Sequence, residues 1–229
     1  MSGPNTHIKP AGNTTKMLRA MVGIGTLCAL MISFTYEGTF NIIKQNRAEA
    51  LERAIFRVLP GITSTATYQL NPDGTFSPAA DEAEGDLVYA GFDEQGQFKG
   101  VAIEASGQGY ADIIRLLYGY DPDKEAIVGM YVLESKETPG LGDKIEKDPD
   151  FLANFEALDV SLNAEHSALA HEVIPVKDGT KENPWEVDGI TGATISSRAI
   201  GNILGASTQR WIPLIYQNRE AFTPQTNVQ

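Results

Sequence analysis

The hydrophobic pattern begins with one long apolar segment near the N-terminus. Residues 20–36 contain no charged side chain, and a helix of that length spans about 26 Å at ~1.5 Å per residue. This is close to the ~30 Å hydrocarbon core of a bilayer, and the two apolar residues before Arg19 extend the segment if that side chain reaches the headgroups. We therefore predict a transmembrane helix over residues 17–36, preceded by a tail of residues 1–16.

The flanking charges predict the orientation of this segment. Lys9, Lys16 and Arg19 precede it, and no acidic residue occurs before Glu37. Positive charge is enriched on the cytoplasmic side of membrane helices, so we expect a cytoplasmic N-terminus and an extracytoplasmic domain. A cleavable signal peptide is the alternative, but its apolar region usually covers about 7–15 residues before a small-residue cleavage site, which is not found here.

A second helical pattern follows the apolar segment. Apolar residues recur at helical spacing over residues 41–59, and Pro60 and Gly61 end the pattern. We assign residues 37–61 to a stalk helix, either separate from the membrane helix or a direct continuation of it.

Strand patterns separated by turn signals occupy the middle of the chain. Short β-rich runs alternate with turn residues at 93–96 and 121–123, as in β-hairpins. The predicted strands cover residues 87–92, 98–105, 113–120 and 126–133. Tyr110, Tyr118 and Tyr120 are interpreted as strand residues, with stacking on a ligand left open for one of them.

Helices return in the last third of the chain. Asp148 as N-cap and Pro149 in the first turn predict a helix start. Its expected apolar face contains Phe151, Leu152, Phe155 and Leu158. A short strand is possible at 172–176, and a final helix is expected to begin near Ser196.

These elements predict an α+β fold: a twisted, mainly antiparallel sheet flanked by helices, behind a single transmembrane helix. The domain is assigned to residues 62–216 and a flexible tail to residues 217–229. All 30 acidic residues and 15 of the 18 basic ones follow residue 36, within a chain of net charge −12. Such an acidic domain repels phosphate backbones, so we expect no nucleic-acid partner.

The most informative stretch is residues 188–198, with the sequence DGITGATISSR. Small residues lead here into a helix N-terminus, where free N–H groups and the helix dipole attract phosphate. The hydroxyls at this position belong to Thr194, Ser196 and Ser197. The stretch lacks the Gly-Lys-Ser/Thr ending of a P-loop. From the residues alone, a phosphate site and an ordinary helix cap both remain open.

A second stretch, residues 134–144, reads ESKETPGLGDK and taken alone is a tight turn after a strand. His166 and His171 are five residues apart and are interpreted as surface residues, so no metal site is predicted.

Together, DGxTGATxSS and ETPGLG closely resemble the flavinylation motif and a second recurrent segment of the FMN-binding domain family. That family includes the G subunit of the Rnf electron-transport complex and the C subunit of the sodium-translocating NADH:quinone reductase. The resemblance covers about residues 17–210 and implies that FMN phosphate is esterified to Thr194 by a flavin transferase that uses FAD and magnesium. Thr191 stands where many members have Ser, and either hydroxyl serves.

The resemblance also implies which residues surround the flavin. From the first motif we expect Asp188, Thr191, Gly192, Ala193, Ser196 and Ser197, in addition to Thr194. From the second we expect Glu137, Thr138, Gly140, Leu141 and Gly142, with the glycines letting backbone approach the ring and Leu141 packing on it. We expect no separate catalytic residue.

The implied function is that of a redox subunit in an ion-translocating complex, which does not turn over a substrate alone. The compact chain is most similar to Rnf G subunits, and the quinone-reductase C subunit is the alternative. The expected partners are other membrane subunits and the flavin transferase. The expected location is the bacterial inner membrane, with a periplasmic FMN domain. A membrane-tethered binding or assembly module without a redox group is the alternative from another class.

Overall fold

The computed structural model describes residues 13–80, 83 and 85–224. It divides into two compact units, one ending at Glu49 and the other beginning at Ala50. The first unit consists of most of helix α1 (Asn13–Val58). This helix is the one described helix long and apolar enough to cross a membrane. The large apolar side chains of its membrane-type segment are exposed, among them Phe34 and Ile32. The expected tail over residues 1–16 lies mostly outside the described residues.

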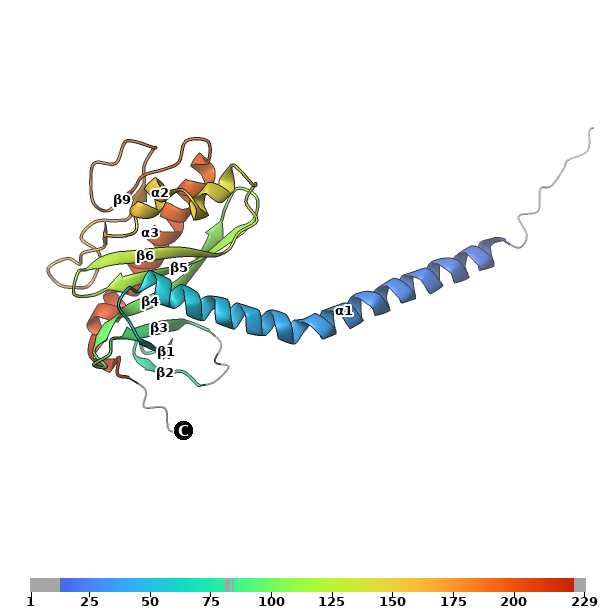
Figure 1. Cartoon of the computed structure of the whole chain (residues 1–229), viewed down its shortest axis with the longest axis horizontal. Coiled ribbons are helices and arrows are strands. Elements are labelled where there is room, and N and C mark those ends of the chain that lie inside the picture. The colour runs from blue at the N-terminus through green and yellow to red at the C-terminus, as the bar shows by residue number, and fades with distance from the viewer. Residues whose placement is uncertain (1–12, 81–82, 84, 225–229) are drawn as a thin grey trace, which may run out of the picture. The chain divides into compact units, whose positions relative to one another are not determined.

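The second unit contains a seven-stranded antiparallel sheet in the order β2-β1-β3-β4-β5-β6-β7 (Figure 1). The four expected strands form its centre, two further strands extend it on one side, and one extends it on the other. The strands are β1 (Ser64–Leu70), β2 (Phe76–Pro78), β3 (Leu87–Phe92), β4 (Phe98–Gln108), β5 (Ile113–Asp121), β6 (Ala126–Glu134) and β7 (Leu158–Asp159).

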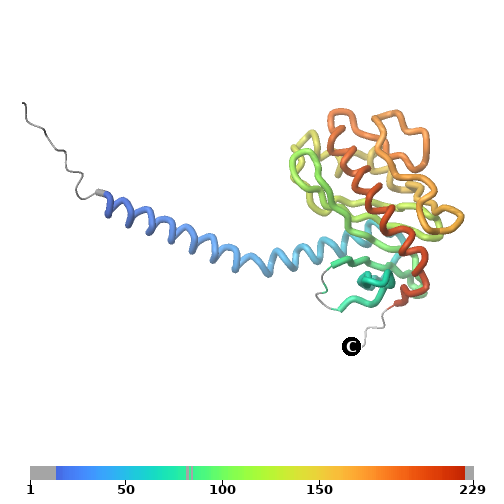
Figure 2. Tube along the Cα trace, turned by 180° about the vertical axis from the view of Figure 1, so that it is seen from behind, coloured from blue at the N-terminus to red at the C-terminus, as the bar shows by residue number. Residues whose placement is uncertain are grey.

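Different helices cover the two faces of this sheet. Helix α3 (Thr194–Gln217) lies across one face (Figure 2) and packs on alternate residues of the central strands, such as Ile103 and Tyr118. The last turns of α1 lie on the opposite face (Figure 1), where Ala54, Ile55 and Val58 pack on neighbouring strand residues. Because side chains of a strand alternate between faces, each central strand contributes to both layers.

A patch of four glycines receives the end of α1. Gly91, Gly100, Gly119 and Gly129 lie on neighbouring strands, and a Cβ added at any of them would meet the last helical residue or a residue shortly after it. At Gly119 a Cβ would overlap the carbonyl oxygen of Val58, and at Gly129 it would lie 2.7 Å from the same atom. The absence of side chains at Gly119 and Gly129 therefore allows the end of the helix backbone to lie directly on the sheet.

The short elements between β6 and α3 correct one expectation. Asp148 caps α2 (Pro149–Ala153), and its Oδ1 accepts the N–H groups of Asp150 at 3.1 Å and Phe151 at 3.2 Å, as expected. The apolar pattern that continues to Leu158 was predicted to be one helical face, and this is wrong, because the helix ends at Ala153 and Leu158 pairs in β7. The remaining elements are η1 (Gly142–Glu146), β8 (Ile174–Pro175), β9 (Glu186–Val187) and η2 (Arg219–Ala221).

The C-terminal segment is not loose over its described part, in contrast to the expectation for residues 217–229. Phe222 is buried, and its ring lies 5.0 Å from that of Tyr68 and 5.1 Å from that of Phe76. The hydroxyl of Tyr68 donates to the carbonyl of Thr223 at 2.5 Å and accepts its N–H at 2.9 Å. A single aromatic residue in a polar segment thus fixes it to the sheet.

The predicted fold class is confirmed: an apolar helix is followed in the sequence by an α+β domain, with an antiparallel sheet flanked by helices.

Candidate functional site

Three segments far apart in the sequence meet at the N-terminus of α3. They are the β4–β5 connection around Tyr110, the loop that follows β6, and the turn that leads into α3. They surround a cavity of about 330 Å³, within the ~300–1,000 Å³ range of ligand sites. This Thr194 cavity is lined by Tyr110, Glu137, Thr138, Leu141, Gly142, Gly192, Ala193, Thr194, Ile195 and Ser196.

The start of α3 is an uncapped helix N-terminus. Its N-cap is Ala193, which has no polar side chain to accept from the first turn. None of the described residues accepts a hydrogen bond from the backbone N–H groups of Thr194, Ile195 and Ser196, whereas the N–H of Ser197 reaches the carbonyl of Ala193 at 2.9 Å. Three donors and the positive end of the helix dipole therefore remain available to an anion. This turn is therefore not an ordinary helix cap, in which a side chain would accept one of these N–H groups.

Thr194 itself is the first residue of α3 and is exposed. Its hydroxyl makes only a long contact of 3.4 Å with the carbonyl oxygen of Ile190. Gly192 precedes it with φ of +85°, and a Cβ there would meet nothing within 4 Å. The turn thus presents the threonine oxygen on the surface, beside the free N–H groups.

The loop after β6 is held by Glu137, which is buried at 5% exposure. Its Oε1 accepts the backbone N–H groups of Tyr110 at 2.8 Å and Ala111 at 3.0 Å, and its Oε2 accepts the hydroxyl of Ser196 at 2.5 Å. One carboxylate therefore connects all three segments of the site. Both of its oxygens are occupied within the protein, so Glu137 supports the cavity wall.

Contacts within the protein require glycine at two positions of this loop. At Gly142 a Cβ would lie 2.6 Å from Oε2 of Glu137 and 2.9 Å from Oγ of Ser196, so this glycine makes room for the buried carboxylate. Gly140 has φ of +79° and donates its N–H to Oδ1 of Asp143 at 2.7 Å. Lys147 lowers the pKa of the Asp143 carboxyl through a hydrogen bond, which keeps that acceptor ionised. Gly140 does not line the cavity.

The other predicted residues that do not line the cavity position the turn before α3. Asp188 accepts the N–H groups of Gly179 at 3.0 Å and Thr180 at 3.3 Å. Thr191 donates its N–H to Asp178 at 3.1 Å. Ser197 is buried, accepts the N–H of Ile190 at 3.1 Å and donates to the carbonyl of Thr194 at 3.3 Å.

Eight of the twelve predicted residues thus line one cavity, and two lining residues were not predicted. Ile195 follows Thr194 directly and is 57% exposed. Tyr110 was interpreted as a strand residue and lies instead in the turn between β4 and β5. An aromatic residue between glycine and alanine in a hairpin connection was the available signal. Tyr118 and Tyr120 do lie in β5 and are buried.

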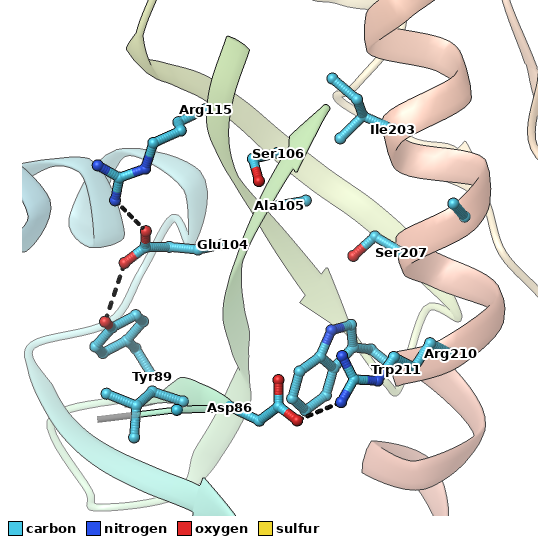
Figure 3. A pocket seen from close by; sticks show the side chains of 13 residues that line it. Asp86, Tyr89, Glu104, Ala105, Ser106, Arg115, Ile203, Ser207, Arg210 and Trp211 are labelled. Atoms are coloured by element: carbon cyan, nitrogen blue, oxygen red, sulfur yellow. Dashed lines mark hydrogen bonds and ion pairs between the residues drawn. The ribbon is translucent and has the colours of Figure 1, made fainter. Parts of the chain in front are cut away.

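A larger cavity of about 450 Å³ lies elsewhere, between α3 and strands β3 to β5 (Figure 3). Its charged side chains are paired with one another: Arg115 with Glu104 at 2.7 Å, and Arg210 with Asp86 (Figure 3). None of its lining residues belongs to either sequence motif. The Thr194 cavity is therefore the candidate functional site.

The site combines an open helix N-terminus, an exposed hydroxyl and an apolar-walled cavity. In a domain that follows a membrane-type helix in the sequence, these features define a class of anchored domain that binds a phosphate-bearing cofactor. A family model described as "FMN-binding domain" matches residues 109–208, the part of the chain that contains all three segments of the site.

Curated relatives agree. The chain is 31% identical over 194 residues to the G subunit of the ion-translocating oxidoreductase complex of Methanosarcina acetivorans, covering 83% of this chain and 90% of the relative. The relative of the same name from Cereibacter sphaeroides is 30% identical over 174 residues, covering 75% and 72%. The chain belongs to the FMN-binding domain family, within the group of G subunits of ion-translocating oxidoreductase complexes.

Solved structures share the fold. NqrC of Shewanella oneidensis superposes with a TM-score of 0.57 at 21% identity, covering 77% of this chain and 99% of that one. The C subunit of the Na⁺-translocating NADH-quinone reductase of Parabacteroides distasonis gives a TM-score of 0.58 at 23% identity, covering 75% and 94%.

Proposed function

We propose that this chain is the electron-transfer subunit of a membrane-bound, Rnf-type ion-translocating oxidoreductase complex and carries FMN joined through a phosphoester to Thr194. The observation that carries the proposal is the uncapped N-terminus of α3, where an exposed hydroxyl lies beside three free N–H groups. The names of the curated relatives support the role in a complex.

The attachment needs an external enzyme, because none of the residues that line the cavity is a base beside Thr194: the one carboxylate, Glu137, is occupied by its own hydrogen bonds. A flavin transferase that uses FAD and magnesium suits the exposed threonine. The bond from Oγ to the phosphorus of the FMN moiety forms, the phosphoanhydride bond of FAD breaks, AMP leaves, and the hydroxyl proton is released.

The residues of the cavity then have distinct tasks. The N–H groups of Thr194, Ile195 and Ser196 hold the phosphate at the helix N-terminus. Leu141 and Ile195 present apolar surface to the ring. When bound, FMN supplies one- and two-electron redox chemistry, which the protein positions and tunes. A covalent link retains the cofactor outside the cytoplasm, where no pool of FMN replaces a lost one.

The membrane assignment follows from α1. The N-terminus lies in the cytoplasm and the FMN domain in the periplasm of a bacterial inner membrane, as the basic residues before the apolar segment predict. The described helix has no acidic residue in its apolar part, so we place the ion path in other subunits of the complex. The chain transfers electrons between partners and does not turn over a substrate alone.

The test is in-gel fluorescence after co-expression with a flavin transferase. Wild type should give a flavin-fluorescent band on a denaturing gel, and its mass should rise by one FMN less one water. Thr194→Ala should abolish the band. Thr65→Ala is the control and should keep the band, because Thr65 is an exposed threonine of β1, outside both motifs, that does not line the cavity.

Two outcomes would refute the proposal. A wild-type chain without flavin would leave a membrane-tethered binding or assembly module. Fluorescence retained in Thr194→Ala would move the attachment to another hydroxyl of the motif.

The C subunit of a sodium-translocating NADH:quinone reductase is the second candidate, favoured by the two solved structures of the same fold. The identity of the proteins that co-purify with the tagged chain separates the two complexes.

A further inference from the structure

Exposed apolar side chains of the second unit gather around the Thr194 cavity. From Ala50 onward, the exposed large apolar residues of the described chain are Phe56, Tyr110, Ile113, Leu141, Ile174 and Ile195. Three of these six line the cavity, and they come from three different segments: Tyr110 from the β4–β5 connection, Leu141 from the loop after β6, and Ile195 from α3. Convergence of unpaired apolar groups on one cavity indicates a ligand with an apolar surface.

Tyr110 is held by its backbone and not by its side chain. Its N–H and that of Ala111 donate to the buried carboxylate of Glu137, and the N–H of Gly109 closes the turn on the carbonyl of Asp112 at 2.9 Å. None of the described residues hydrogen-bonds its hydroxyl, and the residue is 64% exposed. The turn is thus fixed by three hydrogen bonds while the aromatic ring remains without a partner at the cavity.

Resting on the proposed attachment at Thr194, we propose that the phenol ring of Tyr110 stacks on the isoalloxazine ring and is the aromatic wall of the flavin site. A flat tricyclic ring tethered at the mouth of α3 has aromatic faces that stack on a tyrosine. Leu141 and Ile195 supply the aliphatic remainder of the wall. Because the phenol is the one electron-rich aromatic group among the lining residues, it would quench the fluorescence of a bound flavin. The phenol would donate an electron to the excited ring and regain it, with no net reaction.

The experiment compares flavin fluorescence of the full-length, flavinylated chain in detergent before and after unfolding, so that each variant is its own reference. Wild type should be quenched when folded and should brighten severalfold on unfolding. Tyr110→Phe retains the ring but removes the hydroxyl that makes it electron-rich, and Tyr110→Ala removes both the ring and the hydroxyl. Both variants should retain the fluorescent band on a denaturing gel, and both should lose most of the brightening.

Ile113→Ala is the matched control, because Ile113 is an exposed apolar residue next to the same turn that does not line the cavity. It should brighten on unfolding like wild type.

The outcomes separate this inference from the function on which it rests. If wild type carries no flavin, the proposed attachment and this inference both fail. If Tyr110→Phe and Tyr110→Ala carry flavin and brighten on unfolding as wild type does, the attachment stands and the stacking is refuted. Loss of brightening in Ile113→Ala as well would also refute it, because the quenching would then not be specific to Tyr110. Tyr110→Phe tests the phenol even if Tyr110→Ala disturbs the turn.

Discussion

Removal of the Glu137 carboxylate should uncouple the three segments of the site. In Glu137→Ala, the N–H groups of Tyr110 and Ala111 and the hydroxyl of Ser196 lose their shared acceptor. The position is 5% exposed, so water does not readily replace the carboxylate. Glu137→Gln keeps the shape: its amide oxygen can accept the two N–H groups while its NH₂ donates to the serine oxygen.

The expected magnitudes follow from these contacts. A buried donor left without an acceptor costs about 1–3 kcal/mol, and contacts within one network do not add fully. Three such donors therefore predict a loss of about 3–5 kcal/mol in the free energy of unfolding for Glu137→Ala. Glu137→Gln loses the charge but keeps the pairing, which predicts a loss of about 1 kcal/mol. With a slope of about 2 kcal/mol per molar urea, the midpoints should shift by about 1.5–2.5 M and about 0.5 M.

The assay is urea unfolding of the full chain in detergent, monitored by tryptophan fluorescence. Trp211 is buried in the core beside Phe76, with ring centroids 6.3 Å apart, and therefore reports the folding of the sheet domain. A free energy of unfolding for Glu137→Ala within about 1 kcal/mol of the wild-type value would refute the view that this carboxylate holds the site together. So would equal losses in the alanine and glutamine variants.

Two further predictions concern the core. Gly119→Ala places a methyl group on the carbonyl oxygen of Val58 and should cost about 3 kcal/mol or more in urea unfolding; an unchanged midpoint would contradict the close seating of α1. The Tyr118 hydroxyl bonds Ser207 at 2.8 Å, whereas the buried Tyr120 hydroxyl has no partner among the described residues, so Tyr118→Phe should lose about 1 kcal/mol and Tyr120→Phe none. Burial raises the pKa of both phenols. Because the same phenols ionise near pH 10 in the unfolded chain, the free energy of unfolding is unaffected below about pH 10 and falls at higher pH. The double phenylalanine variant should therefore lose less stability than wild type in melts between about pH 9 and 11, and equal losses would argue against the raised values.

The central hairpins and the position of the site were predictable because they depend on local chemistry. Strand alternation and turn residues identified β3 to β6, and Asp148 with Pro149 identified the start of α2. Where a local pattern had two solutions, the prediction was wrong. Leu158 continues a helical period but pairs with β6, because the chain turns to extend the sheet. Such a choice depends on residues distant in sequence, which no local window contains.

Within the site, the motif identified the location but not the task of each residue. Asp188 and Ser197 stand near Thr194 in sequence, yet their side chains hold the preceding loop and turn. Glu137 was expected at the flavin; it lines the cavity, and its carboxylate holds the wall together. These assignments depend on the direction of each side chain in the assembled fold. Stacking was left open for one of Tyr110, Tyr118 and Tyr120, and the sequence could not select Tyr110, because it lies far from Thr194 in the sequence and belongs to neither motif.

The wall of the cavity and the proposed attachment point come from separate parts of the chain, and this would separate two properties of a bound flavin. The threonine and its turn are contiguous, so a transplanted peptide of residues 188–198 contains the acceptor hydroxyl together with its sequence context. Tyr110 and Leu141 reach the cavity only through the assembled sheet. A flavin on such a peptide tag would contact neither residue and would behave as free FMN, whereas the same ester on the complete domain would take its colour, brightness and potential from the fold.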